Sequence, residues 1–141
     1  MKIRCIRELS PQTMELLKSQ YEICEDTSAQ VIIGNPDPLS IPNYPHLELI
    51  QLDSAGYDQY DVEKLNENKI RLCNASGCFD DVNSEDVIGM MIMMYQKLDR
   101  YVLQQKQHIW KRMDQVRMIS GSTVVVVGLG NIGSALAQRL H

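Results

Sequence analysis

The feature that most constrains the fold of this chain is a run of four valines that leads directly into a glycine-rich turn. Val124–Val127 is followed at 128–133 by Gly-Leu-Gly-Asn-Ile-Gly and then by small and apolar residues. Consecutive β-branched residues bounded by turn residues favour a buried strand, and the residues after the turn favour a helix. A strand, a glycine turn and a helix in this order are typical of the first β-α unit of a dinucleotide-binding fold.

The glycines of this motif have separate predicted roles. Gly128 permits the tight turn, Gly130 lets the main chain approach a pyrophosphate, and Gly133 lets the helix pack closely on the strand. The N–H groups at the helix start and the helix dipole would hold the phosphates. We therefore predict a site for NAD or NADP formed by Gly128, Gly130, Asn131, Ile132 and Gly133. The alternative interpretation is an incidental glycine loop.

The motif stands at the end of the 141 residues. The second strand of such a unit lies outside them, and so does the acidic residue, roughly 20 positions further on, that distinguishes NAD from NADP. We therefore expect an incomplete dinucleotide-binding domain. Deletion, proteolysis, an early stop or a partner chain would account for the missing half.

Upstream of the motif, predicted strands alternate with predicted helices. Strands are expected at 2–6, 31–33, 47–52 and 69–73. One helix is expected to begin at Ser10-Pro11, with apolar residues at helical spacing as far as Ile23, and a short helix is expected at 62–66. The proline-rich segment 35–45 is predicted to be a loop. This alternation is typical of a mostly parallel, doubly wound α/β sheet.

Asn83 or Ser84 is predicted to cap the longest helical pattern, which is expected to run to about Gln107. Glu85 and Asp86 lie in its first turn, where the helix dipole favours negative charge. The pattern also contains four methionines, Met90, Met91, Met93 and Met94. We predict that they fill the core, the alternative being an adaptable binding surface.

Two loops of small residues follow predicted strands. Ser54-Ala55-Gly56 follows the strand at 47–52, and Ala75-Ser76-Gly77 follows the strand at 69–73. Ligands of parallel sheets bind at the C-terminal ends of the strands, and small residues there let backbone N–H groups approach a ligand. The alternative is that both loops are simply tight turns.

Composition excludes several classes of partner. The formal net charge of −4 does not attract nucleic acid. The apolar run at 87–94 is far shorter than the roughly 20 residues needed to span a bilayer, and the N-terminus lacks a signal-peptide pattern. We expect a cytoplasmic protein with no membrane partner.

The four cysteines lack metal-ligand spacing, so no metal site is expected, and reduced, mostly buried thiols are predicted.

Together these motifs resemble the D-isomer-specific 2-hydroxyacid dehydrogenases, the group that includes phosphoglycerate-dehydrogenase-like enzymes. Residues 52–58 with Asp61 are similar to the S-x-G-x-D-x-x-D loop of that family, and residues 73–77 to its T-N-x-x-G loop. Trp110 falls where the family commonly has tryptophan. Residues 119–133 are similar to its L-x-G-K-T-x-x-x-x-G-x-G-x-x-G segment.

The resemblance implies a two-domain oxidoreductase that transfers a hydride between a nicotinamide cofactor and a 2-hydroxy or 2-oxo acid. Residues 1–107 would form a flavodoxin-like, parallel-sheet substrate domain, 108–122 a crossing linker, and 123–141 the start of a Rossmann domain. The substrate would bind at Ser54, Ala55, Gly56 and Gly77. The family's catalytic Arg, Glu and His lie beyond residue 141, so no catalytic residue is assigned and these residues alone are expected to be inactive. A homodimer is expected.

Two interpretations from other classes stay open. The first is a shortened, inactive interaction or structural module that dimerises through its terminal strand, because an unpaired apolar strand invites association. The second is a receiver-like regulatory domain, suggested by the flavodoxin-like pattern and the acidic pair Asp80-Asp81, which is expected in a solvated loop.

Overall fold

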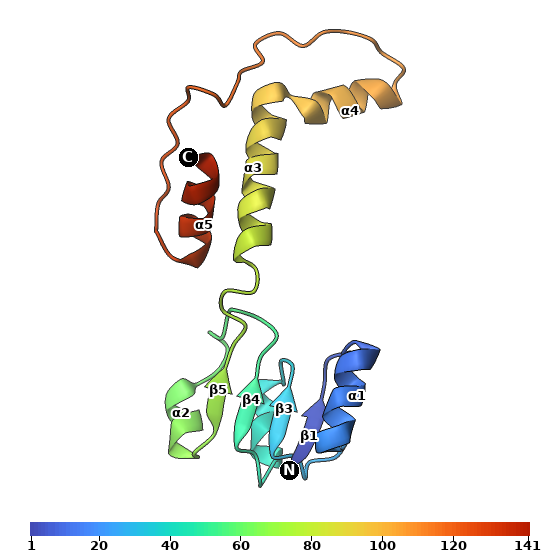
Figure 1. Cartoon of the computed structure of the whole chain (residues 1–141), viewed down its shortest axis with the longest axis vertical. Helices are drawn as coiled ribbons and strands as arrows, with labels where there is room; N and C mark the ends of the chain where they lie inside the picture. The colour runs from blue at the N-terminus through green and yellow to red at the C-terminus, as the bar shows by residue number, and fades with distance from the viewer. The chain divides into compact units, whose positions relative to one another are not determined.

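Five parallel strands form the sheet of the first structural unit. The computed structural model describes all 141 residues, and they divide into this unit, Met1–Ser76, and a second unit, Gly77–His141. The strands are β1 (Lys2–Cys5), β2 (Glu22–Ile23), β3 (Val31–Ile33), β4 (Leu49–Gln51) and β5 (Arg71–Cys73). Their order is β2-β1-β3-β4-β5, and all neighbours pair in parallel (Figure 1). This is the flavodoxin-like strand order, so the predicted parallel α/β sheet is confirmed.

The core of this unit is centred on β3 and β4. Ile32 and Ile50 are paired across the two strands, and both are fully buried. The cluster around them also contains Ile41, Leu47, Leu52, Tyr60, Leu65 and Ile70. The Tyr60 hydroxyl is satisfied within this core, because it donates a hydrogen bond to the Pro36 carbonyl at 2.8 Å.

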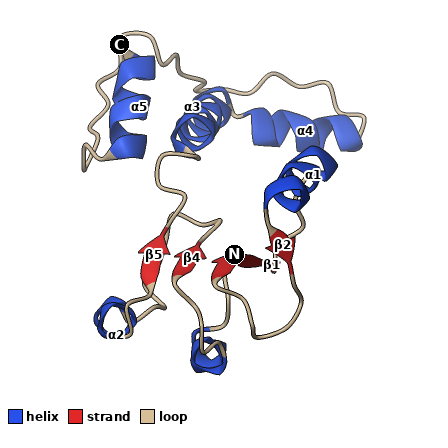
Figure 2. Ribbon diagram, turned by 60° about the horizontal axis from the view of Figure 1, so that its bottom comes forward, coloured by secondary structure: helices blue, strands red, loops and turns tan.

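Side-chain caps define the starts of the helices in this unit. Helix α1 (Pro11–Gln20) begins at Ser10, whose Oγ accepts from the Thr13 N–H at 3.2 Å. Helix α2 (Val62–Glu67) begins at Asp61, which accepts from the Lys64 N–H at 3.0 Å. Figure 2 shows α1 beside β1 and β2, and α2 beside β5. Both helix starts are as predicted.

Two details of this unit differ from the prediction. The loop predicted at 35–45 contains a 3-10 helix, η1 (Pro38–Asn43), which begins at Asp37. Helix α1 ends at Gln20, so the prediction of helix as far as Ile23 is wrong. The two-residue strand β2 takes its place, because the Glu22 and Cys24 N–H groups bond to carbonyls of residues 1 and 3. So short a strand leaves no alternating pattern in the sequence.

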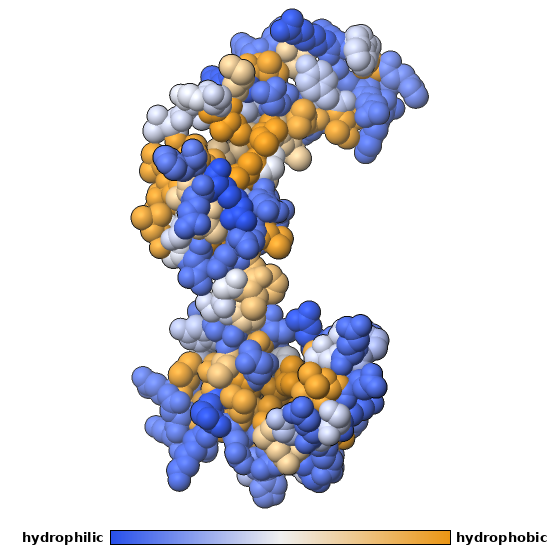
Figure 3. Space-filling model, viewed as in Figure 1, coloured by the Kyte–Doolittle hydropathy of each residue, from blue (hydrophilic) through white to orange (hydrophobic).

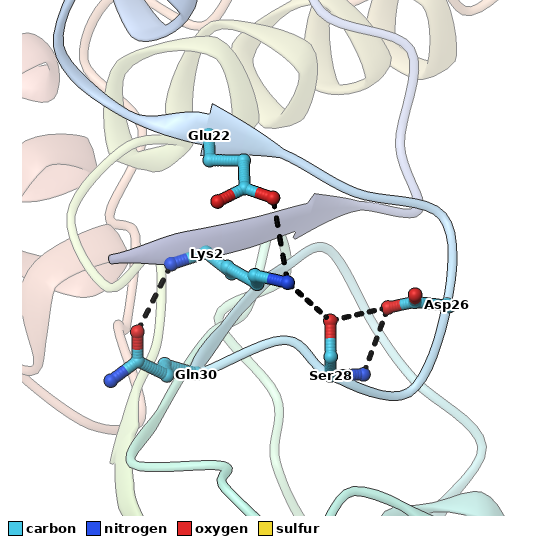
Figure 4. Close-up of polar contacts among 5 residues, drawn as sticks. All are labelled: Lys2, Glu22, Asp26, Ser28 and Gln30. Atoms are coloured by element: carbon cyan, nitrogen blue, oxygen red, sulfur yellow. Dashed lines mark hydrogen bonds and ion pairs between the residues drawn. The ribbon is translucent and has the colours of Figure 1, made fainter.

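Polar side chains stabilise this edge of the sheet (Figure 4). The Lys2 ammonium lies 3.4 Å from a Glu22 carboxylate oxygen and donates to Ser28 Oγ at 3.3 Å. Ser28 Oγ donates in turn to Asp26 at 2.6 Å, and this hydrogen bond, with a second from the Ser28 N–H, lowers the pKa of Asp26. The Lys2 N–H donates to the Gln30 side chain.

The second unit contains three helices and no strand. They are α3 (Asp80–Gln96), α4 (Leu98–Lys106) and α5 (Asn131–Leu140). The prediction of one helix from about 84 to 107 is therefore wrong. Lys97 adopts a left-handed conformation between α3 and α4, with a φ of 54°. The segment after α4 stabilises this break, because the Arg117 N–H donates to the Tyr95 carbonyl and the Lys97 ammonium donates to the Asp114 carbonyl.

Helix α3 also begins earlier than predicted. Its first residue is Asp80, and Phe79 before it provides no side-chain cap. Asp80 and Asp81 therefore do not lie in the predicted loop but in the first helical turn. There the helix dipole stabilises their charges. Ser84, a predicted cap, is instead fully buried inside the helix and donates to the Asp81 carbonyl at 2.8 Å.

The methionines of α3 do not fill a core. Met90, Met93 and Met94 are exposed, so the prediction that they pack inside is wrong for this structure. Figure 3 shows apolar side chains gathered on the visible face of this unit, over α3 and the start of α4. The physical reason is that α3 packs only against α5 and the adjoining α4.

The valine run at 124–127 is not a buried strand. No strand is formed there, and Val125 and Val127 are 80% and 96% exposed. A strand requires a hydrogen-bonded neighbour, and none of the described residues provides one. The predicted β-α unit is thus represented by its turn and its helix α5.

The remaining predictions concern the membrane and the thiols. None of the helices has the length and apolarity that crossing a membrane requires. The four cysteines are free, but Cys73 and Cys78 are exposed, so the prediction of mostly buried thiols is wrong.

Candidate functional site

Three loops meet at the C-terminal edge of the first unit's sheet. They follow β3, β4 and β5 and contain Asn35, residues 53–56 and residues 74–76. Asn35 Oδ1 accepts from the Asp53 N–H at 3.2 Å. On the other side, the Ala75 N–H donates to the Ser54 carbonyl at 2.9 Å. The central loop is therefore held from both neighbouring loops.

In the central loop, the Ser54 hydroxyl and the carbonyls of Ala55 and Gly56 have hydrogen-bond partners, whereas two N–H groups have none. Ser54 Oγ donates to the Gly56 carbonyl at 2.8 Å, and Asn74 Nδ2 donates to the Ala55 carbonyl at 2.7 Å. The N–H groups of Ala55 and Gly56 have no protein acceptor, and both residues are exposed. Adjacent main-chain donors of this kind suit an anion such as a carboxylate.

Two further residues at this edge were not predicted from the sequence. Arg7 follows β1, and its Nη1 lies 3.1 Å from Asp53 Oδ2. Asn35 follows β3 and bonds to the same residue through its side chain. The available signal was their position, since each lies just after a predicted strand of a parallel sheet.

In the second unit, residues 128–133 form the tight turn expected of the glycine motif. Gly128 has a φ of +96°, a conformation that favours glycine. A β-carbon added at Gly133 would overlap the Gly128 carbonyl oxygen and lie 3.1 Å from its carbon. The start of α5 therefore approaches the preceding main chain as closely as the third glycine of such a motif allows.

The start of α5 has no side-chain cap. Gly130 precedes the helix and has no side chain with which to cap the first-turn N–H groups. The helix continues normally from there, because the Ser134 N–H donates to the Gly130 carbonyl at 2.9 Å. Uncapped N–H groups and the positive end of the helix dipole together favour a phosphate.

Helices α3 and α5 lie side by side in this unit (Figure 1). Arg139 Nη2 lies 2.7 Å from an oxygen of Asp81 and 3.6 Å from one of Glu85. The hydrogen bond with Asp81 raises the pKa of the Arg139 guanidinium. At the other end of α5, Asn131 Nδ2 would lie 4.0 Å from a β-carbon added at Gly77, whose φ is +89°.

The predicted site residues therefore form two groups. Ser54, Ala55 and Gly56 lie together in the first unit, beside Ala75. Gly77 belongs to the second unit and lies near Asn131, at the start of the glycine-motif helix. No group of three or more His, Cys, Asp or Glu residues gathers at metal-binding distance.

Comparison with known families covers nearly the whole chain. The catalytic domain of the D-isomer specific 2-hydroxyacid dehydrogenases matches residues 5–87, and the NAD binding domain of the same family matches residues 88–141. This chain belongs to the D-isomer specific 2-hydroxyacid dehydrogenase family. The resemblance found in the sequence motifs is thus confirmed. The two family matches meet inside α3, whereas the structural units divide after Ser76, and the domain limits given above stay a prediction.

Individual members of the 2-hydroxyacid dehydrogenase family are also similar. Glyoxylate/hydroxypyruvate reductase A HPR2 of Arabidopsis thaliana is 33% identical over 92% of this chain and 42% of its own length. A glyoxylate reductase from Paecilomyes thermophila has a TM-score of 0.85 at 18% identity, covering 99% of this chain and 52% of that structure. A D-lactate dehydrogenase from Aquifex aeolicus, complexed with NAD and lactic acid, has a TM-score of 0.80 at 20% identity, covering 99% and 48%.

These comparisons differ in what they establish. At such low identities the structural matches show the fold alone. This dehydrogenase-family chain spans about two fifths of the length of the curated relative.

The close approach at Gly133 is tested by substitution. Gly133→Ala is expected to destabilise α5 by about 1–3 kcal/mol, because the added methyl group overlaps the Gly128 carbonyl. Hydrogen exchange of the Ser134–Leu140 amides measures this as faster exchange. Gly89→Ala is the control, since nothing lies within 4 Å of a β-carbon there and alanine stabilises a helix interior by roughly 0.5–1 kcal/mol. Unchanged protection of α5 in Gly133→Ala would contradict the close approach.

Proposed function

We propose that this chain is the substrate-binding portion and cofactor-domain entry of an oxidoreductase that interconverts 2-oxo acids and 2-hydroxy acids of D configuration with NAD or NADP. The observation that carries the proposal is the turn at 128–133, where only a residue without a β-carbon allows α5 to approach Gly128. This turn lies within the segment that matches an NAD binding domain.

In this proposal the first unit holds the substrate carboxylate. The N–H groups of Ala55 and Gly56 are its donors, because they are exposed and have no protein acceptor. Ser54 shapes the loop through its hydrogen bond to the Gly56 carbonyl. Gly77 is proposed for the substrate site on the sequence resemblance alone, and in the second unit it has a left-handed conformation with a φ of +89°.

The second unit holds the cofactor pyrophosphate. The turn has the tight geometry that such a group requires, so the residues fit it. Gly128, Gly130 and Gly133 leave no side chain between the turn and an approaching pyrophosphate. Asn131 and Ile132 are the first two residues of α5, and their N–H groups would face the phosphates. When bound, the nicotinamide supplies or accepts the hydride.

The protein is further proposed to act in the cytoplasm as a homodimer with no nucleic-acid or membrane partner. Its net charge of −4 supports the absence of a nucleic-acid partner. Residues 1–107, 108–122 and 123–141 are proposed as substrate domain, linker and cofactor-domain entry. No proton donor is assigned among the three histidines, because none of them lies in the 53–56 loop or in the 128–133 turn.

Substrate binding is tested by titrating the isotope-labelled 141-residue chain with D-lactate and following its amide resonances by NMR. Shifts are expected at Ala55 and Gly56. Two charge-assisted hydrogen bonds of about 1.5–3 kcal/mol each correspond to a Kd on the order of millimolar. Lactamide is the matched control, because it has the same shape without the carboxylate. The proposal fails if D-lactate shifts neither amide, or if lactamide shifts both equally.

Turnover by these residues alone is expected to be absent. Hydride transfer to a 2-oxo acid also requires a proton donor, and none is assigned at either glycine-lined site. The measurement is the loss of NADH or NADPH absorbance with glyoxylate, with a complete D-lactate dehydrogenase assayed on pyruvate as the positive control. Turnover of about 1 per second or faster, the range typical of enzymes, would contradict this expectation.

A second candidate function, an interaction module that dimerises through residues 124–127, is favoured by one observation. Val125 and Val127 are almost fully exposed on main chain that has no strand partner. Light scattering of the purified chain is then expected to show a dimer that Val125→Lys dissociates, because a charge on an edge strand opposes pairing. Leu39→Lys, at another exposed apolar residue, is the control. A stable monomer before substitution would rule this candidate out.

A further inference from the structure

An ion pair lies at the ligand-binding edge of the sheet, beside the proposed carboxylate donors. The Asp53 carboxylate belongs to the residue that directly precedes Ser54, and its one ionic partner is Arg7 at 3.1 Å. Asp53 is therefore only two residues from Ala55, whose N–H is proposed to hold an anion. A fixed negative charge at this place opposes anion binding unless a cation compensates it.

The main chain around this pair is held in place by its neighbours. The Ile6 N–H donates to the Ile33 carbonyl at 2.9 Å, so β1 and β3 stay bonded up to the residue before Arg7. Gly34 has a φ of +113°, and a β-carbon there would lie 3.2 Å from the Arg7 nitrogen and 2.7 Å from Ile6 Cγ1. The chain passes closely beside Arg7 only because residue 34 is glycine.

Asp53 is equally constrained. Its N–H donates to Asn35 Oδ1, in the residue that follows Gly34. Its side chain is 28% exposed, against 53% for Arg7, so the carboxylate is the less hydrated member of the pair. A partly desolvated charge acts on a nearby ligand more strongly than a fully hydrated one.

We propose that Arg7 is a positioning residue of the substrate site, which neutralises Asp53 so that the N–H groups of the 54–56 loop accept a carboxylate. This inference rests on the proposed function. An ordinary surface ion pair, by contrast, contributes little even to stability. A positioning residue and an ordinary ion pair differ in their effect on the Kd of the substrate. Only for a positioning residue does removing the Asp53 charge together with the Arg7 charge restore the Kd that is lost when Arg7 alone is substituted.

The experiment is a charge cycle measured by D-lactate titration of the complete 141-residue chain, with the amides of Ala55 and Gly56 as the NMR readout. Arg7→Gln is expected to raise the Kd roughly tenfold, because it exposes the loop to an uncompensated carboxylate. Arg7→Lys keeps the charge and is expected to stay within about threefold of the unsubstituted chain. The double variant Arg7→Gln with Asp53→Asn is expected to return to within about threefold as well, since both charges are gone.

The control is Arg71→Gln, which removes an exposed arginine from the opposite end of the same sheet and is expected to leave the Kd unchanged. If Arg7→Gln alone unfolds the sheet, Asp53→Asn carries the test. It leaves Arg7 as an unpaired cation beside the loop and is expected to lower the Kd several-fold.

The outcomes separate the two proposals. If D-lactate shifts no loop amide of the unsubstituted chain, the proposed function fails and the role of Arg7 fails with it. If the unsubstituted chain binds D-lactate but Arg7→Gln binds it equally well, only the role of Arg7 is overturned. The same conclusion follows if the double variant binds as weakly as folded Arg7→Gln, or if Asp53→Asn leaves the Kd unchanged.

Discussion

Parallel pairing of β3 with β4 and of β4 with β5 is the constraint on which the candidate substrate site depends. Because parallel strands all end at the same edge, the loops that begin at Gly34, Asp53 and Asn74 are brought together there. A slip of one residue between two strands would turn Ile32 or Ile50 out of the core. The burial of these two side chains therefore also fixes the loops, and with them the N–H groups of Ala55 and Gly56.

How far the sequence predicts this protein follows from where each segment finds its packing partner. Strands β1, β3, β4 and β5 were predictable because apolar residues of their predicted runs are buried within the first unit; these are Ile3, Ile32, Ile50 and Ile70. In the second unit, apolar patterns predicted the wrong structure where no neighbouring segment is present for them to pack against. The valines at 125 and 127 have the composition of a buried strand, yet nothing among the described residues pairs with them. The break at Lys97 depends on hydrogen bonds from residues 114–117, which no local pattern reports.

The turn at 128–133 and the loop at 53–56 were predictable to different degrees, because the first is formed by local contacts and the second by contacts between distant residues. The turn at 128–133 is local, so the spacing of its glycines was enough to indicate the close approach at Gly133. The loop at 53–56 is held by Asn35 and Asn74, which are 18 and 19 residues away from their bonding partners. Its small residues indicated a site, but the residues that support it become visible only when the strand order is known. Gly77 shows the limit of this reasoning, since it lies near Asn131 in the second unit.

Recognition of an anion by main-chain N–H groups explains why a neighbouring ion pair matters. Such groups carry only partial charges, so the attraction they offer is comparable with the repulsion from one nearby carboxylate. A site built on a guanidinium would tolerate Asp53, whereas a site built on the Ala55 and Gly56 N–H groups does so only if that charge is compensated. In our proposal Arg7 compensates it from the end of a different strand, β1, and Gly34 leaves the space in which the chain passes Arg7. In the proposed site, the affinity of the loop for a carboxylate would thus depend on three strand ends acting together.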